Sequence, residues 1–291
     1  MGNLIKSEFR KTLTTGLWWG LLIPTVLLSF VLALAFGAAG QSFLDFVSSD
    51  DLDELSELFG FDPGSWTLSA FALARAINVG TIFPMIFGGL AIAGEINRRT
   101  LTVTFLTAPN KVSALTAKMV VYVAWGAIYG LIIVAVSSLG VALTTDSAGL
   151  PDAGGWLGIA GTGLIASILV TMFGVGVGAL LGSTVGTTLL LTLYMLLAEN
   201  LLVLWLSTYM PYIGGFLPNG SASGLTGSIA ASVFLENATG TVTSEMEYAV
   251  RVIAGAGTGA LDWWASGLVF LGWTLLAFFG GWAVIQRKDI T

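Results

Sequence analysis

The chain has 291 residues, of which 55% are hydrophobic and 10% are charged, and its mean hydropathy is +0.89. Soluble domains carry about 25% charged residues, so this composition predicts an integral membrane protein. The net charge of -6 argues against nucleic acid as a partner, because phosphate binding needs a basic face. Since Cys and His are absent, disulfides, thiol catalysis, Cys/His metal sites and histidine-based triads are excluded.

Residues 1–16 are predicted to form an amphipathic helix lying in the membrane surface. Apolar and small residues recur there at helical spacing, and charged residues fill the other side. The apolar side consists of Ile5, Phe9, Thr12, Leu13, Gly16 and Leu17, and the charged side of Lys6, Glu8, Arg10 and Lys11. A solvated start that only anchors topology is the alternative. A cleaved signal peptide is disfavoured, because the apolar run that follows exceeds the usual length of about 7–15 residues.

Six apolar stretches reach the length of about 20 residues that a membrane-spanning helix needs. They are residues 17–39, 68–94, 119–143, 156–181, 187–207 and 263–285. The fourth and fifth come from one uninterrupted apolar region, which is too long for a single crossing. Gly182, Ser183 and Gly186 predict a tight turn between them.

The cations predict the orientation of these spans, because Lys and Arg near span ends are held on the cytoplasmic side. Nine of the eleven cations fall on one side of the predicted topology. They are Lys6, Arg10, Lys11, Arg98, Arg99, Lys111, Lys118, Arg287 and Lys288. Residues 41–66, on the other side, carry seven acidic residues and no cation. We therefore expect one all-α transmembrane domain, residues 1–291, with six transmembrane helices and both termini cytoplasmic.

Two segments on the outer side are predicted to carry helices. Residues 50–59 have an apolar stripe opposite clustered carboxylates, which lack the spacing of an ordered calcium loop, so a solvated face is the favoured interpretation. Residues 208–262 are too long for an ordinary loop. Within them, residues 229–235 and 245–253 are expected to form short helices that cap the outer mouth before the last span.

Polar groups at membrane depth are few: Arg75, Asn78, Glu199 and Asn200. Arg75 and Glu199 each lie about eight residues from the outer end of their span, which is about 12 Å at 1.5 Å per residue. Charges at this depth are costly and commonly mark function or a partner. We expect Arg75 and Glu199 to pair between the second and fifth spans. Contact with a substrate in the translocation pathway is the alternative.

Gly174, Gly178, Gly182 and Gly186 recur at every fourth position. This spacing places bare backbone along one helix face and permits close helix packing. Packing within the chain is the favoured interpretation, and a dimer seam is the alternative.

Residues 95–118, on the cytoplasmic side, are the most informative segment. A carboxylate closes the second span, basic residues follow, and a short amphipathic stretch ends at a proline before the third span. The residues concerned are Glu95, Arg98, Arg99, Thr100, Phe105 and Pro109. The segment resembles the first cytoplasmic loop of the membrane subunits of ATP-binding cassette exporters of the type two permease class. Arg99 stands where these proteins usually have Gly. The resemblance covers roughly 25 residues, and six spans and an N-terminal surface helix agree with it.

The resemblance implies that this loop carries a coupling helix that docks on a cytosolic ATPase subunit. It further implies that the chain is one permease half in the cell membrane, paired with a second copy or a paralogous permease, and that it exports a substrate. The apolar spans suit a hydrophobic substrate. No G-x-x-x-x-G-K-[ST] motif occurs, so ATP and Mg are expected on the partner, with no metal, cofactor or catalytic site on this chain. A stand-alone channel or secondary carrier is the alternative. A channel or carrier of this kind would need rings of polar residues along its pore. An intramembrane enzyme, a further alternative, would need paired carboxylates or an activated Ser.

Overall fold

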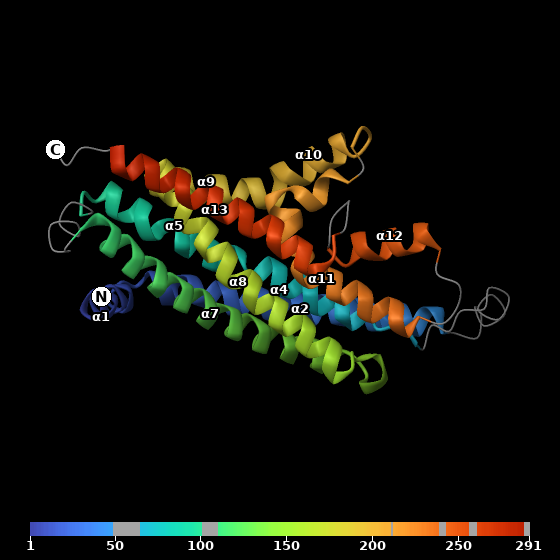
Figure 1. Ribbon diagram of the computed structural model, residues 1–291. Helices are drawn as coiled ribbons and strands as arrows, with labels where there is room; N and C mark the ends of the chain where they lie inside the picture. The colour runs from blue at the N-terminus through green and yellow to red at the C-terminus, as the bar shows by residue number, and fades with distance from the viewer. Residues whose placement is uncertain (49–64, 101–109, 211, 239–242, 256–260, 288–291) are drawn as a thin grey trace.

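The computed structural model describes residues 1–48, 65–100, 110–210, 212–238, 243–255 and 261–287, which form helices and no strand (Figure 1). Within them, six helical segments are long and apolar enough to cross a membrane. These are Leu17–Val47, Leu68–Asn97, Val112–Thr144, Ala153–Leu181, Thr184–Leu206 and Trp263–Gln286. The predicted number and order of spans are confirmed, and the chain has the architecture of a multi-pass membrane protein. The predicted helix at residues 50–59 lies outside the described residues.

The short helix α1 (Gly2–Thr14) lies crosswise to the spans at one end of the bundle. In Figure 1 it is seen nearly end-on, whereas the spans run across the picture. The same end holds the last residues of α5 (Ile82–Asn97) and α13 (Trp263–Arg287) and the first residues of α7 (Lys111–Thr144). We call this the basic end, because its described cations are Lys6, Arg10, Lys11, Arg98, Arg99 and Lys118. The opposite, acidic end holds Asp45, Asp146, Asp152, Glu245 and Glu247.

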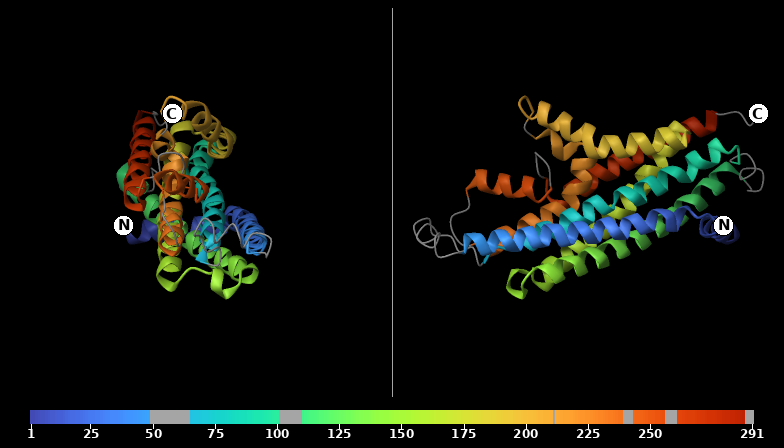
Figure 2. Two further views of the ribbon diagram at one scale, coloured as in Figure 1. Left: turned by 90° about the vertical axis from the view of Figure 1, so that its right-hand side faces the viewer. Right: turned by 180° about the vertical axis from the view of Figure 1, so that it is seen from behind.

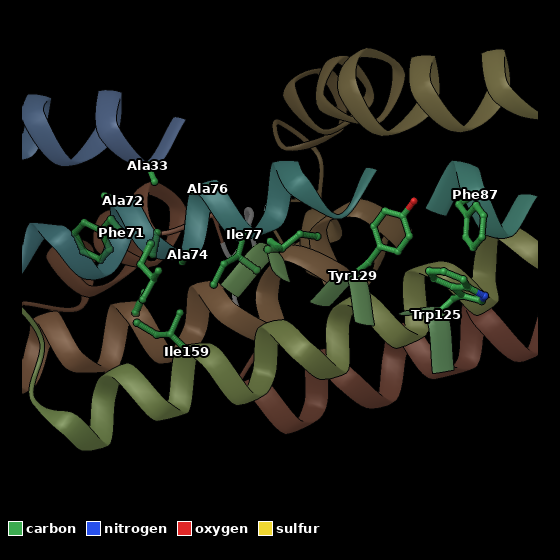
Figure 3. Close-up of a cluster of buried hydrophobic side chains, with 14 of the residues drawn as sticks. Ala33, Phe71, Ala72, Ala74, Ala76, Ile77, Phe87, Trp125, Tyr129 and Ile159 are labelled. Carbon is green, nitrogen blue, oxygen red and sulfur yellow. The ribbon is translucent and has the colours of Figure 1, made fainter. Parts of the chain in front are cut away.

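The second span is the centre of the bundle. It consists of α4 (Leu68–Gly80) and α5, which meet at Thr81, and its apolar window is 72% buried. Figure 3 shows the buried hydrophobic side chains at this centre. These include Phe71, Ile77 and Phe87 of the span itself, Trp125 and Tyr129 of α7, Ile159 of α8 (Ala153–Leu181) and Ala33 of α2 (Leu17–Val47).

The predicted turn between the fourth and fifth spans is confirmed. Helix α8 ends at Leu181, and Gly182 follows with a left-handed φ of 65°, which glycine adopts without steric cost. The Ser183 side chain then accepts a hydrogen bond from the Gly186 N–H and caps α9 (Thr184–Leu193). The fifth span continues through a π-helical turn, η3 (Tyr194–Ala198), into α10 (Glu199–Leu206), and only 17% of its apolar window is buried.

Two of the four glycines in the predicted packing repeat do pack against another helix. A Cβ added at Gly174 would overlap the Met85 carbonyl, and one at Gly178 would overlap the Gly89 carbonyl, so α8 and α5 touch through bare backbone. The groove does not continue, because Gly182 ends α8. Gly186 lies on α9 and would meet only its own neighbour Ser183.

Residues 229–235, predicted to form a short helix, belong to a longer helix in the segment after α10. A short 3-10 turn, η4 (Ile213–Phe216), leads into α11 (Pro218–Asn237), which packs along α4, α8 and α13. The Trp273 indole, ten residues into α13, donates to the Phe216 carbonyl at 2.8 Å. Glycine, alanine, serine and threonine dominate α11 and allow this close packing, which an apolar-run criterion overlooks. Helix α12 (Ser244–Ile253) agrees with the predicted residues 245–253. Figure 2 shows α11 within the bundle from two further directions.

Candidate functional site

Four charged side chains from three helices meet at the basic end. Lys118 of α7 donates to Glu95 of α5 and to Glu8 of α1, with nitrogen to oxygen distances of 2.7 Å for both. Lys11 of α1 pairs with the same Glu95 oxygen and lies 3.6 Å from Glu8. We call Glu8, Lys11, Glu95 and Lys118 the charge cluster. Its two carboxylates and two ammonium groups balance, so the cluster is formally neutral.

Three of the four members of the cluster are buried although the cluster stands at the end of the bundle, and the Lys11 side chain is 41% exposed. The Lys118 side chain is 3% exposed, and those of Glu8 and Glu95 are 10% and 8% exposed. Burying a charge is expensive unless it is paired and hydrogen-bonded. Here Lys118 bridges two carboxylates, and removal of any one member leaves the cluster with an unbalanced charge.

Local structure places each member. Glu8 and Lys11 are three residues apart, so they share one face of α1. Glu95 lies in the last turn of α5, and Lys118 lies two turns into α7, whose start is capped by Asn110 accepting from the Ser113 N–H at 2.7 Å. Residues 101–109, the middle of the predicted coupling loop, therefore run between two helices whose ends are both held in the cluster.

Aromatic packing holds α1 in the same place. The Phe9 ring stacks on Trp125 with centroids 5.6 Å apart, and Trp125 also contacts Trp18 and Phe87. The Tyr129 hydroxyl donates to the Trp18 carbonyl at 2.5 Å. The predicted place of Glu8 on the charged side of α1 is wrong: Glu8 is buried beside Phe9, where Lys118 is its partner.

A cavity of about 460 Å³ adjoins the cluster. Its wall includes the four charged residues together with Thr15, Leu90, Gly94, Arg98, Thr184 and Tyr122. The second carboxylate oxygen of Glu95, Oε2, is buried and has no hydrogen-bond partner among the described residues. Among the described residues, no group of three or more Asp and Glu side chains could hold a metal ion. The cluster joins three helices and gives the cavity a polar lining.

The structure divides the residues predicted to dock on the ATPase. Glu95 is buried and engaged within the chain, so direct contact between its side chain and a partner is not available in this conformation. Arg98, Arg99 and Thr100 are exposed. Phe105 and Pro109 lie outside the described residues.

Arg99 has a left-handed backbone with φ of 57°. The chain turns there through hydrogen bonds from the Arg99 N–H to Ile96 and from the Thr100 N–H to Glu95. A left-handed position is the one that glycine fills most easily. The exporter family that residues 95–118 resemble usually has glycine at this position. The backbone of this chain is left-handed there, a conformation that glycine adopts easily.

The predicted pair of Arg75 and Glu199 is wrong. Arg75 donates to the carbonyls of Val252 and Ile253 at 3.0–3.3 Å, at the end of α12. The Glu199 carboxylate accepts from the N–H groups of Asn219 and Gly220 at 2.8 and 2.7 Å. Each of the two side chains is therefore hydrogen-bonded to the end of a different helix, with the sign that the helix dipole favours.

The two predicted amides differ in their surroundings. Asn78 accepts from the Thr226 hydroxyl at 2.6 Å and donates to the Ser223 carbonyl at 3.3 Å, so it joins α4 to α11. Asn200 is exposed and donates to the Leu196 carbonyl of its own span. Arg75, Asn78 and Asn200 do line one small cavity, and Glu199 is not part of its wall.

Sequence reasoning missed Glu8 and Lys118 as site residues. The sequence predicts Lys118 as a cytoplasmic cation and as the last residue of the coupling segment 95–118 but gives it no partner, although apolar residues follow it on a helix that enters the bundle. A lysine there needs an anionic partner, and Glu8 is the carboxylate of the N-terminal helix. That combination is the signal that could have predicted their pairing.

No protein-family model matches this chain, and no curated protein matches it either.

Proposed function

We propose that the chain is the permease half of an ATP-binding cassette exporter, and that it works with a separate cytosolic ATPase subunit and a second permease. The observation that carries the proposal is the charge cluster. It holds both helices that flank residues 101–109 and ties them to the crosswise helix α1. The local resemblance of residues 95–118 to a coupling loop supplies the functional meaning of that arrangement.

The mechanism follows from the connections. A partner that moves residues 101–109 pulls on α5 and α7 together, because Lys118 joins them through Glu95. Helix α1 moves with them, because Glu8 and Lys11 belong to the same cluster. Helix α5 in turn is packed backbone against backbone on α8. A push at the basic end thus reaches the centre of the bundle as a shift of packed helices.

ATP belongs to the partner in this proposal. The sequence contains no P-loop motif to cradle nucleotide phosphates. The exposed Arg98, Arg99 and Thr100 are the docking surface next to the loop, and Glu95 supports them from inside.

Copurification tests the partnership. The tagged chain is extracted from its native host in mild detergent, and mass spectrometry is used to look for a chain with a P-loop in stoichiometric amount. Substitution of both arginines, Arg98→Glu with Arg99→Glu, is expected to reduce recovery of the ATPase about tenfold or more. Arg251→Glu at the acidic end is the matched control and should leave recovery unchanged. Absence of any ATPase from the wild-type complex contradicts the proposal and favours the stand-alone channel or carrier.

The proposed orientation places the basic end in the cytoplasm and the chain in the cell membrane. The chain has no cysteine, so single cysteines report without background. A cysteine at Glu245 should react with an impermeant thiol reagent added to intact cells, whereas one at Asn110 should react only after lysis. Both positions are exposed in the structure. Labelling of the Asn110 site in intact cells contradicts the orientation.

A further inference from the structure

A small polar cavity lies inside the bundle, away from the charge cluster. It has a volume of about 130 Å³ and lies between α4, α5, α8, α11 and the fifth span. Its polar wall consists of Arg75, Asn78, Thr81, Asn200, Asn219 and Ser223. Its apolar wall consists of Val79, Ile82, Met85, Val170, Met195, Leu196 and Ala222.

Arg75 brings a positive charge to this cavity without an anionic partner. Its Nε and Nη2 atoms donate to the carbonyls that end α12, and among the described residues Nη1 has no acceptor. No described carboxylate forms a salt bridge with it. Glu199, the acidic residue of the adjacent span, is occupied by the N–H groups of α11. Among the described residues, the cation at this cavity therefore has no anionic partner, at the depth of the spans where an unpaired charge is costly.

The polar groups around Arg75 are held in place. Asn78 is fixed by Thr226 and Ser223, and Asn219 is fixed through its backbone to Glu199. A guanidinium offers donors in a rigid fork that matches the oxygens of a phosphate or carboxylate. The amides of Asn200 and Asn219 add further donors and acceptors at the wall.

The fifth span connects the wall of the cavity to the exposed apolar surface of the bundle. Leu196 lines it and is also 45% exposed, and Asn200, one turn later, is exposed as well. Leu193 and Leu197, on the same span, are exposed by about half. A group bound at Arg75 can thus be attached to an apolar chain that lies along the fifth span.

We propose that this cavity binds the anionic group, a phosphate or carboxylate, of an amphiphile whose apolar chain lies against the fifth span near Leu196. The charge of the ligand supplies the counterion that Arg75 lacks. The apolar half of the wall selects an amphiphile over a free anion. This inference stands apart from the ATPase partnership, because binding is measured on the permease chain alone.

Binding is tested with the full chain, purified in a non-ionic detergent. The probe is a labelled single-chain lysophosphatidic acid, which joins a phosphate to one acyl chain. Two competitors separate the contributions: lysophosphatidylcholine of the same chain length, which has no net charge, and inorganic phosphate, which has no chain. The probe should bind saturably, and each competitor should be weaker by about tenfold or more. Inorganic phosphate competing as well as the probe overturns the amphiphile, and equal competition by the zwitterion overturns the anionic specificity.

Substitutions assign the binding to the cavity. Arg75→Gln is expected to weaken the probe by about tenfold or more, and Arg75→Lys by less, because the charge remains while the fork is lost. Arg251→Gln is the matched control, since Arg251 already pairs with Glu247 and Asp262, and its affinity should stay within about twofold.

Asn200→Leu provides a variant that leaves the helix contacts of Arg75 intact. Its side chain bonds only to its own helix, so the substitution removes a polar group at the cavity without breaking an interhelical hydrogen bond. We expect about threefold weaker binding or more. If Arg75→Gln does not yield folded protein, this variant decides. Unchanged affinity in either folded variant overturns the proposed site.

Discussion

Lys118 and Arg75 are both cations on spans, and the fold deals with them in opposite ways. Lys118 is buried between Glu8 and Glu95, and its charge is matched within the chain. Among the described residues, Arg75 has only backbone carbonyls as partners, and it borders a cavity. The comparison teaches that one cation serves to join helices and the other keeps capacity for a ligand, because a charge that is fully paired has nothing left to offer.

The largest effect should come from breaking the paired site. Lys118→Met leaves two buried carboxylates without their shared partner, and breaking a buried pair costs about 3–5 kcal/mol of unfolding free energy. The measurement is thermal unfolding of the purified chain in detergent. Lys6→Met, an exposed position on α1, is the control and should change stability by less than about 0.5 kcal/mol.

A second substitution sharpens this result. When Glu8→Gln is combined with Lys118→Met, the negative charge of Glu8 is removed together with the positive charge of Lys118. Lys11 then remains to pair with Glu95. The double variant should therefore recover part of the loss. Additive losses would show that Glu8 and Lys118 do not interact, and the account of a joined cluster would fail.

Arg75→Gln should have a smaller effect on stability. It removes hydrogen bonds to the end of α12 but also removes an unmatched charge, so we expect a net loss of about 1–2 kcal/mol. Hydrogen exchange should show faster opening of α12, with α5 and α7 unaffected. A loss as large as that of Lys118→Met would mean that Arg75 has a buried anionic partner after all.

The smallest expected effect is the coupling between Arg75 and Glu199 in the free energy of unfolding. Because each is bound to a different helix end, the losses from Arg75→Gln and Glu199→Gln should add to within about 0.5 kcal/mol in a double-mutant cycle. The cycle is measured by thermal unfolding of the four proteins under one condition. A coupling of several times that value would restore the ion pair that the sequence suggested.

The spans were predictable because long apolar runs have few alternatives, and the turn at Gly182 was predictable because glycine and serine interrupt such a run. Helix α11 was not, because its small and polar residues resemble an outer loop until α4, α8 and α13 are seen to surround it. In the same way Glu95 was visible as a charge at a span end. Its burial depends on Lys11 and Lys118, which are 84 and 23 residues away in sequence.

Arg75 and Glu199 show a further limit of the sequence. Equal depth on two spans made an ion pair reasonable, but depth does not fix the direction in which each side chain points. Helix ends also compete for charged groups, and the sequence does not reveal where α11 begins or α12 ends. Glu199 accepts hydrogen bonds at the N-terminal end of α11, and Arg75 donates hydrogen bonds at the C-terminal end of α12.

The central claim is that an ATPase docks at the basic end, beside the helices joined by the charge cluster. Site-specific photocrosslinking in cells tests it most directly, with a photoreactive amino acid placed either at Arg98, exposed at the end of α5, or at Tyr248 on α12 at the acidic end. The account predicts a crosslink from position 98 to a cytosolic chain that carries a P-loop, and none from position 248. A crosslink to such a chain from position 248, or no ATPase crosslink from position 98, would contradict it.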